Sequence, residues 1–223
     1  MARRIYQISK KGIMLKAINV EFESPINPGE ILNPAAVFYN GKNLWFAASR
    51  PTESWVFLLT MDGKKIRTVN FSAVDLLPQS ILDISRNILV TGEEHDLTYQ
   101  FDYNFNLIRT INMGASPPSE GSLSYDSKSL LWEGEFPPRI KYKDFDGITL
   151  KSIDISGIDS LGGSISFDGA YVWFFGGAAV KIYKITGGGS PVVGIDLSSI
   201  LSSANSLSFN GRDFFIATAD GVV

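Results

Sequence analysis

The chain has 223 residues, with 20 basic and 23 acidic side chains and a formal net charge of −3. Because its lysines and arginines are scattered, it offers no basic surface of the kind that nucleic acids require, and we expect no nucleic-acid partner. It contains no cysteine, which excludes disulfides and thiolate metal sites, and no apolar run long enough for a membrane span. Residues 1–12 also lack the apolar stretch of a signal peptide, so a cytoplasmic or particle-associated location is the default expectation.

The first predicted elements are two strands, at residues 4–9 and 14–20, followed by a proline-containing connection. A repeated pair then begins, made of an aromatic-centred strand, a polar turn and a second apolar strand. In chain order the pairs are AVFYNGKNLWF at 36–46, ILDISRNILV at 81–90, SLSYDSKSLLW at 122–132, SISFDGAYVWF at 164–174 and SLSFNGRDFFI at 206–216. The equivalent central residues are Tyr39, Ile84, Tyr125, Phe167 and Phe209, at separations of 45, 41, 42 and 42.

A third and a fourth strand follow each of the first four pairs, and the fourth strands hold Val69, Ile111, Ile153 and Ile195, each 42 residues apart. The fifth pair has no such continuation, and the strands at 4–9 and 14–20 supply what it lacks. Four strands in units of about 42 residues are typical of propeller blades. The sequence therefore predicts an all-β, five-bladed β-propeller with four antiparallel strands per blade, a closing blade built from both termini, and a single domain over residues 1–223.

Turns and small residues fit the same pattern. Asn-Gly or Asp-Gly pairs separate successive strands, as tight hairpins require, at 40–41, 62–63, 146–147, 168–169 and 210–211. Ser124, Ser166 and Ser208 come just before the central aromatic residue, and small side chains are what a crowded innermost strand accepts.

The unit at 166–174, followed by the strand at 181–185, resembles the repeats of YVTN and NHL-type propellers, and the likeness covers essentially the whole chain. The Trp-Asp pair of WD40 repeats is missing, and a double glycine ends a second strand, as in kelch repeats, in one unit alone, at Gly176-Gly177. The resemblance implies the propeller fold and carries over no site motif, because one fold supports many functions.

Loops between second and third strands, together with those between blades, share one face of a propeller. We expect this acidic rim to be the contact face for a partner or ligand, with Trp55 as a surface anchor. Its candidate residues are Arg50, Glu53, Trp55, Glu93, Glu94, His95, Asp96, Glu133, Glu135 and Arg139.

Three functions compete for this face. The first is a non-enzymatic binding or assembly module, a scaffold that recognises a protein or glycan partner. The second is a lectin-like or divalent-cation site, in which Glu93, Glu94, Asp96, Glu133 and Glu135 would supply the oxygen ligands that calcium prefers. The third is a hydrolase or transferase that uses a carboxylate pair. With one histidine in the chain, we assign no catalytic residue and no obligatory cofactor, and the sequence leaves the oligomeric state open.

Overall fold

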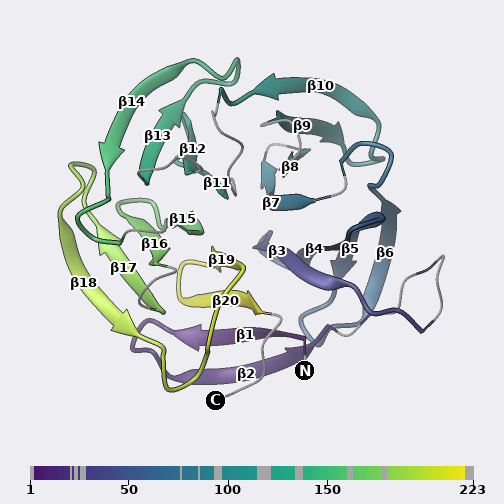
Figure 1. The fold of residues 1–223 in the computed structure, drawn as a ribbon, viewed down its shortest axis with the longest axis horizontal. Helices are drawn as coiled ribbons and strands as arrows, with labels where there is room; N and C mark the ends of the chain where they lie inside the picture. Colours follow the sequence, from purple (N-terminus) through teal and green to yellow (C-terminus); the bar gives the residue numbers. More distant parts are fainter. Residues whose placement is uncertain are drawn as a thin grey trace.

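The computed structural model describes residues 3–20, 22, 25, 29–75, 77–84, 86–92, 97–114, 122–133, 138–159, 163–176 and 180–218, with only the backbone of Trp132 and Glu133. These residues form five four-stranded antiparallel sheets around a central axis, which confirms the predicted all-β, five-bladed propeller (Figure 1). Within the described ranges there are no helices, and thus no helix that could cross a membrane.

Each blade runs from an innermost strand near the axis to an outermost strand on the circumference. Blade 1 contains β3 (Asn33–Tyr39), β4 (Leu44–Arg50), β5 (Glu53–Leu59) and β6 (Lys65–Asn70). Blade 2 contains β7 (Pro78–Ile84), β8 (Asn87–Gly92), β9 (Leu97–Asp102) and β10 (Leu107–Asn112). Blade 3 contains β11 (Ser122–Tyr125), β12 (Leu130–Glu133), β13 (Arg139–Lys143) and β14 (Thr149–Asp154). Blade 4 contains β15 (Ile165–Phe167), β16 (Val172–Gly176), β17 (Lys181–Ile185) and β18 (Pro191–Asp196).

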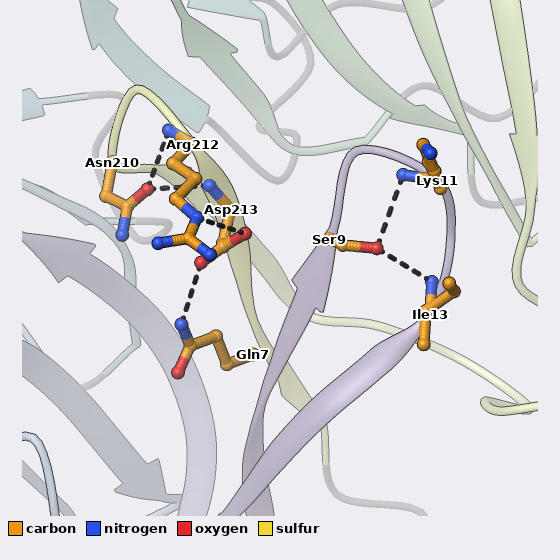
Figure 2. A network of polar contacts seen from close by, with 7 residues as sticks. All are labelled: Gln7, Ser9, Lys11, Ile13, Asn210, Arg212 and Asp213. Atoms are coloured by element: carbon orange, nitrogen blue, oxygen red, sulfur yellow. Dashed lines mark hydrogen bonds and ion pairs between the residues drawn. The ribbon is translucent and has the colours of Figure 1, made fainter.

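Blade 5 joins the two ends of the chain, as the repeat predicts. Its strands are β19 (Ser206–Phe209), β20 (Asp213–Thr218), β1 (Arg4–Ser9) and β2 (Met14–Asn19), and β20 pairs with β1 from Arg4 opposite Thr218 to Ser9 opposite Asp213. Figure 2 shows a polar contact across this seam, where Gln7 Nε2 donates to Asp213 Oδ2 at 2.9 Å. The ring is therefore closed by hydrogen bonds between the first and last strands.

Strand pairing corrects one predicted equivalence. The innermost residues that face the second strands at the same register are Tyr39 opposite Leu44, Tyr125 opposite Leu130, Phe167 opposite Val172 and Phe209 opposite Phe214. In blade 2 the residue in this register is Asp83, opposite Ile88, and not the predicted Ile84. The two partners are five residues apart in every blade, as Asp83 and Ile88 are, whereas Ile84 would need Leu89 as its partner. A carboxylate therefore lies where the other four blades have an aromatic ring.

Serine hydroxyls join the innermost strands of neighbouring blades. The backbone N–H groups of Leu123, Ile165, Leu207 and Val37 donate at 2.8–3.0 Å to Ser80, Ser122, Ser164 and Ser206 of the preceding blade. A second row runs from Phe209 to Ser166 and from Tyr39 to Ser208, at 3.0 Å each. Blade 1 has Ala36 and Phe38 at these registers, so it offers blade 2 no such hydroxyl acceptor.

Basic residues on the outermost strands join the blades at the opposite edge. Lys16 donates to Met61 O at 2.6 Å, Arg67 donates to Asn104 O at 3.0 Å, and Arg109 pairs with Asp146 at 2.9 Å. Lys151 donates to Gly187 O in the same way. Each of the four side chains reaches the turn between the third and fourth strands of the next blade, so these turns are held by the neighbouring sheet.

Candidate functional site

Three of the predicted rim residues form one cluster at the β4–β5 hairpin. Arg50 Nε lies 2.5 Å from Glu53 Oε1, and the Trp55 indole N–H donates to Glu53 Oε2 at 2.8 Å. Glu30, from the connection between blades 5 and 1, pairs with Arg50, which places the two kinds of loop on one face. Glu53 is fully buried and Trp55 is 7% exposed, so the expectation of Trp55 as a surface anchor is wrong.

Most of the remaining rim residues lie outside the described residues: Glu93, Glu94, His95, Asp96 and Glu135, together with the side chain of Glu133. Arg139 begins β13 in blade 3, opposite Asp154. Hydrogen bonds from Ser156 lower the pKa of Asp154 most, and the charge of Arg139 contributes to the same shift. Among the described residues, no group of three or more His, Asp or Glu side chains is placed to hold a metal ion. The acidic rim as a cation site stays a prediction.

A pocket of about 310 Å³ lies instead between blades 1 and 2, on the face of the β3–β4 and β9–β10 turns. That face is opposite to the predicted rim. In Figure 1 the two blades lie side by side, with β3 and β7 next to the axis. The pocket is lined by Asn40, Trp45, Leu58, Arg67, Asp83 and Tyr103.

Asp83 is the centre of the polar contacts in this pocket. Its Oδ2 accepts hydrogen bonds from the Trp45 indole N–H at 2.9 Å and from Asn40 Nδ2 at 3.1 Å, both in blade 1. Its Oδ1 accepts the Tyr103 hydroxyl of blade 2 at 2.5 Å. The half-buried carboxylate thus receives donors from both blades, and it bridges the junction that lacks the serine bonds.

Tyr103 stays a hydrogen-bond donor over the physiological pH range. Its hydrogen bond to Asp83 is the main cause that raises the pKa of Tyr103 to about 12, and burial and the Asp83 charge act in the same direction. The nearby charge of Arg86 lowers this pKa. At neutral pH the Tyr103 hydroxyl therefore donates to the carboxylate and still has lone pairs that can accept.

Arg67 and Phe105 form the outer wall of the same junction. Arg67 donates to the carbonyls of Tyr103 and Asn104, and its guanidinium carbon lies 5.2 Å from the centre of the Phe105 ring. Phe105 has a φ of 64°, whereas the corresponding turn positions of the other blades are glycines, at Gly12, Gly63, Gly147 and Gly189. A bulky residue at positive φ costs about 1–3 kcal/mol, and such strain concentrates at functional sites.

A signal for this pocket is present in the sequence, although the predicted rim does not include it. In four blades an aromatic residue is followed by Asn or Asp, as in Phe167-Asp168, and the Asx side chain caps the tight turn. In blade 2 the order is reversed, to Asp83-Ile84. The reversal places a carboxylate in the space between two blades and not in the turn. This departure from the repeat indicates the position of the pocket, which the charge of the loops does not.

No described protein family matches the chain, and no curated protein sequence matches it. Solved structures do resemble it. Glutaminyl cyclase from Myxococcus xanthus has a TM-score of 0.66 at 12% identity, over 100% of this chain and 97% of that one. A nidogen–laminin complex has a TM-score of 0.61 at 12% identity, over 96% of this chain and 84% of that one. A streptogramin B lyase has a TM-score of 0.58 at 14% identity, over 96% of this chain but 66% of its own length. At these identities the likeness shows the fold alone, and it agrees with the expected resemblance to YVTN and NHL-type propellers.

Proposed function

We propose that this protein is a non-enzymatic binding module that recognises its partner through the pocket between blades 1 and 2. The observation that carries the proposal is the exchange of an aromatic residue for Asp83 at one of five equivalent registers, which leaves a polar, lined cavity. Packing alone favours the aromatic residue, because in the other four blades it packs against the preceding blade.

The chemistry of the pocket supports binding over catalysis. A carboxylate that acts as a general acid needs a vacant position for the reacting group. Asp83 instead accepts hydrogen bonds from Asn40, Trp45 and Tyr103. Such a group is held in one orientation, which suits recognition.

The similar structures admit both kinds of function. One is the enzyme glutaminyl cyclase, and another is a complex in which nidogen meets laminin. The second shows that a propeller of comparable fold takes part in a protein complex, in line with a binding role.

The test is a ¹H–¹⁵N NMR titration that follows two tryptophan indole N–H signals. Trp45 reports on the pocket, and Trp173, whose indole donates to Asp168 at 2.7 Å in blade 4, is the internal control. The probes are three sets of fragments: neutral alcohols and methyl glycosides, carboxylates and phosphates, and amines and guanidines. We expect at least one set to shift the Trp45 signal and leave Trp173 in place.

The matched variant is Asp83→Phe, which gives blade 2 the kind of residue that the other blades have at this register. It should keep the fold, checked by its thermal midpoint, and abolish the Trp45 response. If none of the three sets moves Trp45, or if Asp83→Phe responds as the wild type does, the proposed function is wrong.

A further inference from the structure

We infer that the pocket between blades 1 and 2 binds a single uncharged sugar ring, as the terminal residue of a glycan. This inference rests on the proposed function and adds the chemical class of the ligand. It is carried by the mixed charge of the pocket, its hydrogen-bonding groups, its apolar wall and its size.

The charges at the pocket oppose a ligand of either sign. Asp83 would repel a carboxylate or phosphate, while Arg67 in the wall would repel an ammonium or guanidinium group. Arg86 adds a second positive charge close enough to act on Tyr103. Both groups already hydrogen-bond within the protein, since Asp83 accepts from three donors and Arg67 donates to two carbonyls, and this reduces what they can offer to a charged ligand. Because burying an incompletely compensated charge is costly, the pocket favours a neutral polar ligand.

The polar groups match hydroxyls, which donate and accept at the same time. An ionised carboxylate offers about four acceptor positions, and Asp83 uses three of them, for Asn40, Trp45 and Tyr103. Arg67 has about five N–H groups, and two of its nitrogens donate to turn carbonyls. A ligand hydroxyl can therefore donate to Asp83 and accept from Arg67 or an adjacent N–H.

The rest of the lining suits the C–H face of a sugar ring. Trp45 and Leu58 contribute apolar surface, and the Phe105 ring lies 5.6 Å from the Trp45 ring behind them. Small-molecule sites typically hold about 300–1,000 Å³, so a cavity of about 310 Å³ accepts one ring and excludes a longer chain. Tyr103 is 44% exposed at the edge, which leaves an opening through which the remainder of a glycan can extend.

The experiment is isothermal titration calorimetry of the intact protein with methyl glycosides of glucose, galactose, mannose and N-acetylglucosamine. Glucuronic acid and glucosamine serve as the anionic and cationic counterparts. We expect at least one neutral glycoside to bind, and both charged counterparts to bind at least tenfold more weakly than the best neutral one.

Two pocket variants and one control assign the binding to this site. Asp83→Asn should weaken the best glycoside at least tenfold, and Tyr103→Phe, which leaves the carboxylate in place, should weaken it several-fold. Asp168→Asn changes a carboxylate that accepts a tryptophan N–H outside the pocket, in blade 4, and should leave the affinity unchanged.

The outcomes separate this inference from the proposed function. If charged probes bind at the pocket as tightly as neutral ones, or if only charged fragments shift the Trp45 signal, the sugar inference is wrong and the binding function stands. If glycosides bind but neither Asp83→Asn nor Tyr103→Phe weakens them, the sugar site lies elsewhere and the inference is equally wrong. If no probe of any class binds at Trp45, both proposals fail.

Discussion

Two junctions of the same ring solve the same packing problem in different ways. Between blades 4 and 5, the Trp173 ring meets Phe209 at 5.9 Å and Phe214 at 4.9 Å, and Lys10 from the turn lies 4.5 Å over the Phe209 ring. Between blades 1 and 2, Trp45 meets the carboxylate of Asp83, and Tyr103 replaces Lys10 at the corresponding turn position. The first junction is filled by rings, and the second is held by hydrogen bonds around a cavity.

The partner of each tryptophan explains the difference. Trp173 donates to Asp168, in the turn of its own blade. Burial raises the pKa of Asp168, but hydrogen bonds from Tyr171, Trp173 and Ala170 outweigh burial and lower it. Trp45 instead donates to Asp83 in the next blade, and the turn of blade 1 has, in place of an aspartate, Asn40, which donates to the same carboxylate. Where the acceptor is Asp168 in the turn, the junction between blades 4 and 5 is packed with aromatic rings. Where the acceptor is Asp83 on the innermost strand, the junction between blades 1 and 2 contains a polar pocket.

The largest expected loss of stability comes from a substitution in the junction between blades 4 and 5, which aromatic rings fill. Phe209 is 9% exposed and lies between Trp173 and Phe214, so Phe209→Ala should lower the free energy of unfolding by about 3–5 kcal/mol. Chemical denaturation measures this loss. A change below about 1 kcal/mol would contradict the assignment of Phe209 to the core between these blades.

The matching change at the polar junction should cost less. Asp83→Ala removes the acceptor of the Trp45 indole N–H, and Trp45 is only 3% exposed. An unsatisfied buried donor lowers the free energy of unfolding by about 1–3 kcal/mol. The same denaturation experiment compares the two variants directly. If Asp83→Ala destabilised the protein more than Phe209→Ala does, Asp83 would be chiefly structural, and the interpretation of this junction as a binding pocket would lose its support.

The serine bonds give a smaller and more local effect. Ser206→Ala leaves the Val37 N–H without its 3.0 Å acceptor at the junction of blades 5 and 1, and we expect a loss of about 1–2 kcal/mol. The exposed Ser202→Ala is the control and should stay within about 0.5 kcal/mol of the wild type. Equal effects of the two substitutions would show that the hydroxyl bonds do not join the blades.

The smallest effect appears only at high pH. The folded protein holds the Tyr103 proton more tightly than the ordinary pKa of 10.0 implies, so this group favours the folded state below about pH 10 and loses that contribution as the pH rises towards about 12. A spectrophotometric titration of phenolate should show one tyrosine fewer near pH 12 in Tyr103→Phe. If the variant instead loses a group that titrates near pH 10, the hydrogen bond to Asp83 is absent.

The architecture was predictable because it repeats. Spacing of Val69, Ile111, Ile153 and Ile195 fixed the blade length, and the chain ends supplied the missing strands. The glycines of Asn-Gly and Asp-Gly turns take positive φ as expected, for example 95° at Gly41 and 96° at Gly169. Such features depend on local backbone geometry, and a single sequence shows them directly.

The candidate site could not be predicted in the same way. In the sequence of blade 2, Ile84 matches the apolar character of the central register better than Asp83 does, and Asp83 has apolar residues on both sides. The position of Trp55 near a loop favours an exposed ring, but in the structure the ring is buried and its N–H donates to the buried Glu53. The first error concerns which of two adjacent side chains points between blades, and strand register decides that. The second concerns a strand that is covered on both faces, since all residues from Glu53 to Phe57 are buried.

The most direct test of the binding pocket is a crystal structure of the protein soaked with the methyl glycoside that binds best. We predict density for one ring between blades 1 and 2, with a hydroxyl within hydrogen-bonding distance of Asp83 and its apolar face towards Trp45 and Leu58. A ring bound elsewhere on the propeller, or a junction in which the protein's own side chains fill the space around Asp83, would contradict the presence of a binding pocket there.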